Sequence, residues 1–308
     1  LFCDRYDCII VGYDGKGVAI YNPKENSVID DPFFSMEVDL SKSKVYSITE
    51  DRSGNLWFGL LQKGLYRQPI DFNGFSYMGY KLGSGRNVIG SACVISVLID
   101  SRQRTWVGTD KDGLYVFDAA NRLQQHLLAG IPSTVMTVAE SADGRIWIGS
   151  YGEGGGWIDP ASMKYHPLNY PGDDHLIIMD IEADSRGRIW MATMRHGLIC
   201  MEPDQQIRTY SMTEGADNDR SVNSISNDFV SQVHVSPDGQ RVYAATTMGI
   251  CCLDIASGSW TKVFTTSGTD GRPVPSNCLK YGEPVRVARE YDGRLWYGTT
   301  TGLFCYDL

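Results

Sequence analysis

The sequence lacks long apolar runs, basic clusters and extended segments of helical periodicity. No apolar stretch approaches the ~20 residues that span a bilayer, so no transmembrane helix is predicted within these 308 residues. The formal net charge is −9, and nucleic-acid binding requires a basic stripe that is missing here. The composition therefore excludes a nucleic-acid partner and leaves membrane attachment to sequence outside this chain.

The residue types that carry metal or nucleophilic chemistry are present but are not grouped. There is no CxxC, HxH, HExxH or HxxxH motif, so neither a metal nor another cofactor is predicted. The glycine-rich residues 151–157 have no helix pattern or Lys-Ser/Thr after them, which argues against a phosphate-binding loop. No convergent catalytic set is recognisable, and we predict that this chain is not an enzyme.

The eight cysteines are an even number, as in a disulfide framework, but their positions favour packing. Cys200, Cys252 and Cys305 each follow a glycine by three residues, and the same place in other segments holds Ile20 or Val116. A position that accepts such residues is an apolar packing site, where a free cysteine acts as a small hydrophobe. Cys3 and Cys8 are the only pair close enough across a hairpin to form a disulfide, and their state stays open.

The sequence is rich in glycine and tyrosine, with 33 and 17 residues. It also contains an internal repeat. The string VYSITEDRSGNLWFG, which begins at Val45, returns at intervals of roughly 40 to 50 residues. Each copy contains a β-rich run, a D-x-x-G-like turn, a strand with a large aromatic residue, a polar loop and a strand that opens with glycine. The central residues of the seven units are Ile10, Trp57, Trp106, Trp147, Trp190, Tyr243 and Trp296.

This pattern predicts an all-β fold, a seven-bladed β-propeller of four-stranded antiparallel blades over residues 1–308 as one domain. The aromatic column is expected in the core between blades, and the turn aspartates, such as Asp51 and Asp184, are expected to shape hairpins. The first and last blades are incomplete, since the chain opens inside a first strand and ends with a third. We therefore expect a domain cut from a longer protein.

The repeated string D-x-x-G-x-L-W-x-G-T-x-x-G-L, with the SNDFV lead-in at residues 226–230, resembles the two-component regulator propeller repeat. The likeness covers all seven units and is most specific in the five that carry tryptophan. Such repeats form the periplasmic sensor region of hybrid two-component regulators of Bacteroidetes. The resemblance implies a homodimeric, inner-membrane-anchored receptor that detects carbohydrate breakdown products and signals to a histidine kinase.

A ligand would be expected where the loops between second and third strands open, because propellers favour that end. Aromatic rings can stack on a sugar while carboxylates and guanidinium groups hold its hydroxyl groups. The candidate loop residues are Tyr13, Asp110, Lys111, Tyr151, Glu153, Arg195 and His196. On the inner strands, ten residues before the aromatic column, Asp180 and Arg286 are candidates to line the central channel or form a structural network.

Three functions stay open at this point. The first is a sensor that binds an oligosaccharide, and the second is a structural or protein-interaction propeller that mediates receptor dimerisation, with solvated loop tips. The third is a propeller lyase or glycosidase, for which His196 beside Glu153 is a weak candidate pair. The repeat and the lack of a catalytic set favour the first.

Overall fold

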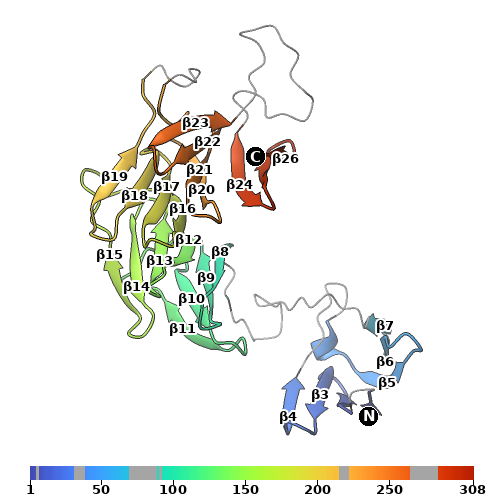
Figure 1. Cartoon of the computed structure of the whole chain (residues 1–308). Coiled ribbons are helices and arrows are strands. Elements are labelled where there is room, and N and C mark those ends of the chain that lie inside the picture. The colour runs from blue at the N-terminus through green and yellow to red at the C-terminus, as the bar shows by residue number, and fades with distance from the viewer. Residues whose placement is uncertain (5–6, 31–38, 69–88, 90–91, 215–221, 264–283) are drawn as a thin grey trace. The chain divides into compact units, whose positions relative to one another are not determined.

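The computed structural model describes residues 1–4, 7–30, 39–68, 89, 92–214, 222–263 and 284–308 (Figure 1). The chain divides into two compact units, Leu1–Ser91 and Ala92–Leu308, and each is described by itself. Both consist of antiparallel sheets, and the short 3-10 helix η1 (Leu40–Lys42) is the one helix in the described ranges. None of these ranges holds a helix with the length and apolarity that crossing a bilayer requires.

Unit 1 contains two sheets. The first has the order β1 (Phe2–Cys3), β2 (Ile9–Gly12), β3 (Val18–Asn22), β4 (Ser27–Asp30). The second has the order β5 (Val45–Glu50), β6 (Leu56–Leu60), β7 (Gly64–Gln68). Ile10 on β2 and Phe58 on β6 are fully buried in one apolar cluster, which also contains Leu40 of the 3-10 helix.

Unit 2 contains five sheets. Its strands are β8 (Val94–Ile99), β9 (Thr105–Thr109), β10 (Leu114–Phe117), β11 (Leu123–Leu127), β12 (Val135–Glu140), β13 (Ile146–Ser150), β14 (Gly155–Asp159), β15 (Lys164–Pro167), β16 (Ile178–Ala183), β17 (Ile189–Thr193), β18 (Leu198–Met201), β19 (Ile207–Tyr210), β20 (Val230–Val235), β21 (Arg241–Thr246), β22 (Gly249–Asp254), β23 (Ser259–Val263), β24 (Val285–Tyr291), β25 (Arg294–Thr299) and β26 (Leu303–Asp307). Four of these sheets have four strands in sequence order, and the last, β24 to β26, has three.

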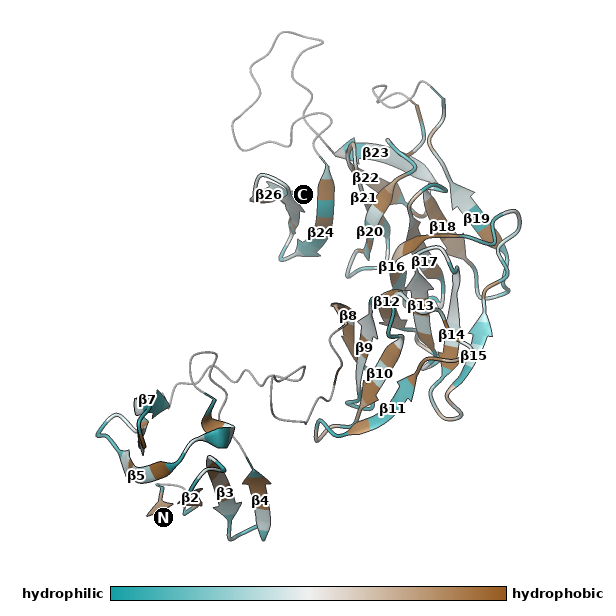
Figure 2. Cartoon of the chain, turned by 180° about the vertical axis from the view of Figure 1, so that it is seen from behind, coloured by the Kyte–Doolittle hydropathy of each residue, from teal (hydrophilic) through white to brown (hydrophobic). Residues whose placement is uncertain are grey.

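Within unit 2 the sheets stack side by side through their first strands. β12 lies against β8 and β16, and β20 lies against β16 and β24. Each apolar cluster joins two neighbouring sheets, as where Trp106 and Leu114 pack against Val135 and Ile148. Figure 2 shows the same pattern, with hydrophobic residues along β8 and β10 and mostly hydrophilic ones on the outer strands β11 and β15. A sheet of this kind buries its faces only against its neighbours, as expected for propeller blades.

Seven sheets of three or four antiparallel strands match a seven-bladed propeller, and each carries one predicted aromatic-column residue on its second strand. The predicted incompleteness appears as a first strand of only two residues, β1, and a last sheet without a fourth strand in the described ranges. The fold class is confirmed. A single domain over residues 1–308 stays a prediction.

The aromatic column is not buried uniformly. Trp106, Trp190 and Tyr243 are at most 1% exposed, whereas Trp296 is 38% exposed and Trp57 is half-buried. Each buried ring packs on the sheet that follows its own, and Trp57 and Trp296 lie on the last sheets of their units. Within its own unit Trp296 is therefore covered by no later sheet, and for Trp57 and Trp296 a core position stays a prediction.

The turn between the first and second strands holds the aromatic column in place. Asp51, Asp100 and Asp184 each accept a hydrogen bond from the indole Nε1–H of the tryptophan six residues later, at 2.9, 2.9 and 3.1 Å. Ser141 takes the same place and accepts from Trp147 at 3.2 Å. The same three aspartates accept the backbone N–H four residues later. One carboxylate thus shapes the turn and orients the indole.

The cysteines follow the packing prediction. Cys200 is 1% exposed and lies opposite Trp190, and Cys252 lies opposite Tyr243. Cys3 and Cys8 are both free. The register places Cys3 opposite Ile9, and Cys8 directly precedes β2. Cys278 lies outside the described residues.

Candidate functional site

The loops between second and third strands form one end of unit 2, together with the linkers that precede each inner strand. We call residues 110–113, 151–154 and 194–197 with these linkers the loop face. Backbone hydrogen bonds fix each loop to a linker: Gly113 N–H donates to Ser133 O at 2.9 Å, and Gly197 N–H donates to Asp228 O at 3.0 Å. The loop face is therefore a set of short, braced loops.

Two of the predicted acidic residues brace these loops. Asp110 accepts a hydrogen bond from the Thr134 hydroxyl at 3.1 Å, and the backbone N–H of Lys111 donates to the same hydroxyl at 3.3 Å. Glu153 accepts from both the backbone N–H and the hydroxyl of Ser133, at 3.0 and 2.7 Å. These carboxylates already have partners, so they orient the loops more readily than they bind a ligand.

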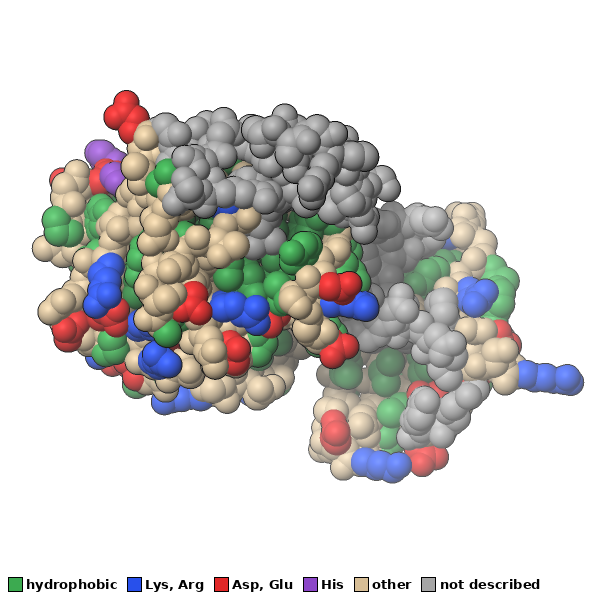
Figure 3. Space-filling model, turned by 45° about the horizontal axis from the view of Figure 1, so that its top comes forward, with side chains coloured by type: hydrophobic (Ala, Val, Ile, Leu, Met, Phe, Trp, Pro, Cys, Tyr) green, Lys and Arg blue, Asp and Glu red, His purple; other side chains and the backbone are tan. Residues whose placement is uncertain are grey.

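His196 belongs to a polar cluster that joins two neighbouring sheets. Its Nε2 lies 2.7 Å from Oδ2 of Asp173, and Tyr170 lies beside its ring with centroids 5.5 Å apart. Oδ1 of Asp173 accepts the backbone N–H of His175, whose Nδ1 lies 3.3 Å from Gly152 O. The hydrogen bond from His196 lowers the pKa of Asp173. Figure 3 shows histidine side chains beside acidic ones on unit 2.

Sequence reasoning missed Tyr170, Asp173 and His175, because they lie in a linker rather than in a repeated loop. The spacing of the linkers varies between units, so no column aligns them. Their proximity to His196 comes only from the fold. Within the described ranges, no group of three or more His, Cys, Asp or Glu side chains could hold a metal ion.

Tyr151, Arg195 and Lys111 are the predicted loop-face residues whose side chains stay available among the described residues. Tyr151 is 54% exposed and Arg195 is also exposed, and no described residue hydrogen-bonds with either side chain. The backbone of Tyr151 bridges to Ile177 in the linker, which brings its loop toward that of Arg195. An exposed phenol and an exposed guanidinium on neighbouring loops can contact both the carbon face and the hydroxyl groups of a polar ligand.

Tyr13 occupies the corresponding loop in unit 1 and is 36% exposed. Its backbone N–H donates to Gly17 O at 2.8 Å, and its carbonyl accepts from Val45 N–H at 3.0 Å. The loop thus has the same braced form as those of unit 2. Because the two units are described separately, Tyr13 is not brought together with the residues above.

Asp180 lies on the inner strand β16 and links three sheets. Its carboxylate accepts from the Thr137 hydroxyl on β12 and from the backbone N–H of Val233 on β20, both at 3.2 Å. Gln232 repeats the arrangement one sheet later, because its Oε1 accepts the backbone N–H of Ala288 at 2.7 Å. These side chains satisfy donors on the inner strands that no neighbouring strand of the same sheet can pair. The predicted structural network is thus present for Asp180.

Arg286 does not share this column. Val287, not Arg286, lies opposite Gly298, and Arg286 is the exposed residue at the register shift between Val285 and Val287. The count of ten residues back from Trp296 fails because the turn before β25 is shorter than in the earlier sheets. Arg286 therefore does not pair with Asp180.

Replacing Asp180 by asparagine is expected to flatten part of the pH dependence of stability. Burial raises the pKa of Asp180 to about 6, against the hydrogen bonds from Val233 and Thr137. As pH rises from about 4 to 6, the unfolded chain releases this proton before the folded chain does, so the free energy of unfolding falls. As pH rises from 4 to 7, the free energy of unfolding of Asp180→Asn, measured by urea unfolding, should increase by about 2 to 3 kcal/mol relative to that of the wild type. Parallel stability curves for the two proteins would contradict this.

Comparison with protein families matches residues 39–61 and 130–152 to the model described as Two component regulator propeller. These segments contain the strand pairs β5–β6 and β12–β13 with their turn residues and tryptophans. The resemblance read from the repeat is confirmed in these segments. No curated protein sequence matches the chain.

Solved structures share the fold. The extracellular domain of a hybrid two-component system from B. thetaiotaomicron matches 99% of this chain and 38% of that chain, with 22% identity and a TM-score of 0.57. A second such domain from that organism matches 100% and 47%, with 16% identity and a TM-score of 0.49. Virginiamycin B lyase from Staphylococcus aureus matches 86% and 84%, with 13% identity and a TM-score of 0.51. The chain spans 38% of the first of these proteins.

Proposed function

We propose that this chain is a ligand-binding sensor propeller of a periplasmic, inner-membrane-anchored two-component receptor, and that its loop face in unit 2 binds an oligosaccharide. The observation that carries the proposal is the regulator propeller repeat in a fold shared with an extracellular two-component domain. In this proposal, dimerisation and histidine kinase signalling belong to the rest of the receptor.

The residues of the loop face support binding more than turnover. Tyr151 and Arg195 are exposed beside a paired Asp173 and His196, while Glu153 is occupied by Ser133. A lyase or glycosidase would need a nucleophile, an acid or a metal aimed at one point. The likeness to virginiamycin B lyase, at 13% identity, extends to the fold alone. Binding without chemistry is therefore the function that this face fits.

Substitutions on the loop face should weaken oligosaccharide binding. We expect Tyr151→Ala and Arg195→Ala each to lower the affinity by about tenfold, because each removes one stacking or charged hydrogen-bonding group. Isothermal titration calorimetry against a panel of plant and host oligosaccharides measures the effect. Arg186→Ala is the matched control, since Arg186 is exposed at the turn on the other end of the same sheet.

Two results would count against this proposal. If no oligosaccharide of the panel binds the chain, the sensing role of this unit is wrong. If an oligosaccharide binds and neither loop-face variant changes its affinity, recognition lies elsewhere and the face serves a structural or dimerisation role.

A further inference from the structure

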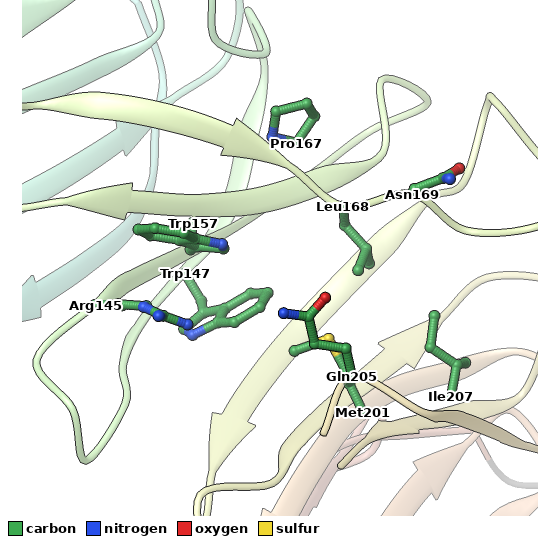
Figure 4. A pocket seen from close by; sticks show the side chains of 9 residues that line it. All are labelled: Arg145, Trp147, Trp157, Pro167, Leu168, Asn169, Met201, Gln205 and Ile207. Atoms are coloured by element: carbon green, nitrogen blue, oxygen red, sulfur yellow. The ribbon is translucent and has the colours of Figure 1, made fainter. Parts of the chain in front are cut away.

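A separate cavity of about 200 Å³ opens on the outer flank of unit 2, between the β12–β15 sheet and the β16–β19 sheet (Figure 4). Its lining comes from β13, β14, β15, β18, β19 and the adjoining turns and linker, and none of it from the inner strands β12 and β16. The residues that line it include Arg145, Trp147, Trp157, Leu168, Asn169 and Gln205. The space equals roughly seven water molecules, which suits a single six-membered ring with its substituents.

The cavity wall carries several solvent-accessible hydrogen-bond donors that have no protein partner among the described residues. Among the described residues, no acceptor is found for Trp157 Nε1–H, for the side-chain amides of Asn169 and Gln205, or for the terminal nitrogens of Arg145. Figure 4 shows the indole nitrogen of Trp157 on the side facing Leu168 and Gln205. No aspartate or glutamate lines the cavity. A ligand rich in acceptors is therefore favoured over a cationic one.

Contacts with Trp157 and Asp143 orient the Arg145 side chain. Its guanidinium lies 4.2 Å from the centre of the Trp157 ring, and its Nε is 3.3 Å from Oδ2 of Asp143. The Trp157 ring in turn stacks on His166, with centroids 4.0 Å apart. These contacts fix the guanidinium plane and leave its two terminal nitrogens to form paired hydrogen bonds with a carboxylate.

The remaining wall is apolar. Trp147 is 4% exposed and donates its own Nε1–H to Ser141, so it offers the cavity only its carbon edge. Leu168 extends the apolar surface from the linker after β15. A ring with C–H faces and several oxygen atoms matches both halves of this wall.

We propose that this flank cavity binds a sugar acid, one pyranose ring bearing a carboxylate, with the carboxylate on Arg145 and the hydroxyl and ring oxygens on the Trp157, Gln205 and Asn169 donors. The cavity shares Leu168 and Asn169, at the start of the linker before β16, with the loop face, but it is not lined by Tyr151, Asp173, Arg195 or His196. A neutral sugar would forgo the paired hydrogen bonds of the guanidinium, and a free aromatic ring would leave the four donors without partners.

The test is titration of the whole chain with D-galacturonate and with D-galactose, which differ by the carboxylate. A ligand of this size should bind with a dissociation constant on the order of 1 mM, measured by calorimetry or saturation-transfer NMR. We expect galacturonate to bind about tenfold more tightly than galactose, and Arg145→Gln to remove that preference. Trp157→Phe, which keeps the ring but removes the donor, should weaken binding about threefold to tenfold.

Arg122→Gln is the control, because Arg122 is an exposed arginine paired with Asp118 in another turn of unit 2. Equal affinity for galacturonate and galactose would overturn the proposal, as would galacturonate binding that survives both Arg145→Gln and Trp157→Phe. Tyr151→Ala should leave galacturonate binding at the cavity unchanged. If Tyr151→Ala loses oligosaccharide binding but keeps galacturonate binding, only the loop face is affected. The failure of one proposed site can therefore be distinguished from the failure of the other.

Discussion

Replacing Asp184 by alanine is expected to lower the free energy of unfolding by about 3 to 5 kcal/mol, because a buried cation then loses its partner. The Asp184 side chain is 1% exposed, and its Oδ2 accepts from Arg188 Nε at 2.6 Å and from Trp190 Nε1 at 3.1 Å. Arg188 is 9% exposed at its side chain, and its Nη2 has no partner among the described residues. Without the carboxylate, the guanidinium would be buried uncompensated.

The charge state of Asp184 follows from the same contacts. Burial alone would raise its pKa, but the hydrogen bonds from Trp190 and Arg188 outweigh burial and hold the pKa below its usual value. A carboxylate with a lowered pKa stabilises the fold above its unfolded-state pKa, and this contribution fades as pH falls through the folded-state value. The effect of the substitution should therefore be full at pH 7 and smaller in acid.

Asp118→Ala is the matched control for this prediction. Like Asp184, Asp118 accepts two backbone N–H groups in its turn and pairs with the arginine four residues later, here Arg122. The difference is exposure, because the Arg122 side chain is 77% exposed and no tryptophan is involved. We expect a much smaller loss than for Asp184→Ala in urea unfolding followed by circular dichroism, because water screens an exposed pair. Similar losses in the two variants would show that burial of the pair is unimportant.

The positions of the aromatic column, and those opposite them on the third strands, could be predicted from the sequence because each position favours one type of side chain. A large aromatic residue opposite a small apolar one recurs in four of the seven sheets, as with Trp190 opposite Cys200, and a periodic pattern reports such positions directly. The aspartate–tryptophan hydrogen bond was also open to prediction. Its constant spacing of six residues, from Asp51 to Trp57 and from Asp184 to Trp190, is visible in the sequence.

The candidate site was harder to predict, because it depends on segments that do not repeat. Asp173 reaches His196 from a linker of irregular length, and no count along the chain brings the two together. Turn length had a similar effect at Arg286, because the turn between β24 and β25 is one residue shorter and the residue opposite Gly298 is therefore Val287, nine positions before Trp296. Strand periodicity predicts which face of a sheet each side chain occupies, whereas the length and conformation of the loops determine which side chains of different segments come into contact.

Replacing Gly197 by alanine is expected to destabilise the chain by about 3 kcal/mol, the second large effect. Gly197 has φ +70°, a left-handed conformation that costs other residues about 1 to 2 kcal/mol. A Cβ there would also lie 2.1 Å from the backbone oxygen of Tyr210 and 2.8 Å from Ile225 Cδ1. Tyr210 pairs with Leu198 across β18 and β19, so relief of the clash requires the two strands to separate. Overpacking of this kind adds about 1 to 3 kcal/mol.

Gly154→Ala separates the clash from the backbone strain. Gly154 occupies the same place before the third strand of the preceding sheet and has φ +72°, but a Cβ there meets nothing within 4 Å. This variant should lose only the left-handed cost, about 1 to 2 kcal/mol, in the same urea unfolding experiment. If Gly197→Ala and Gly154→Ala lose equal stability, backbone conformation alone explains the glycine that opens each third strand. A larger loss at Gly197 means that close approach of the outer strand selects glycine there, and that the loop bearing Arg195 and His196 owes its position to that contact.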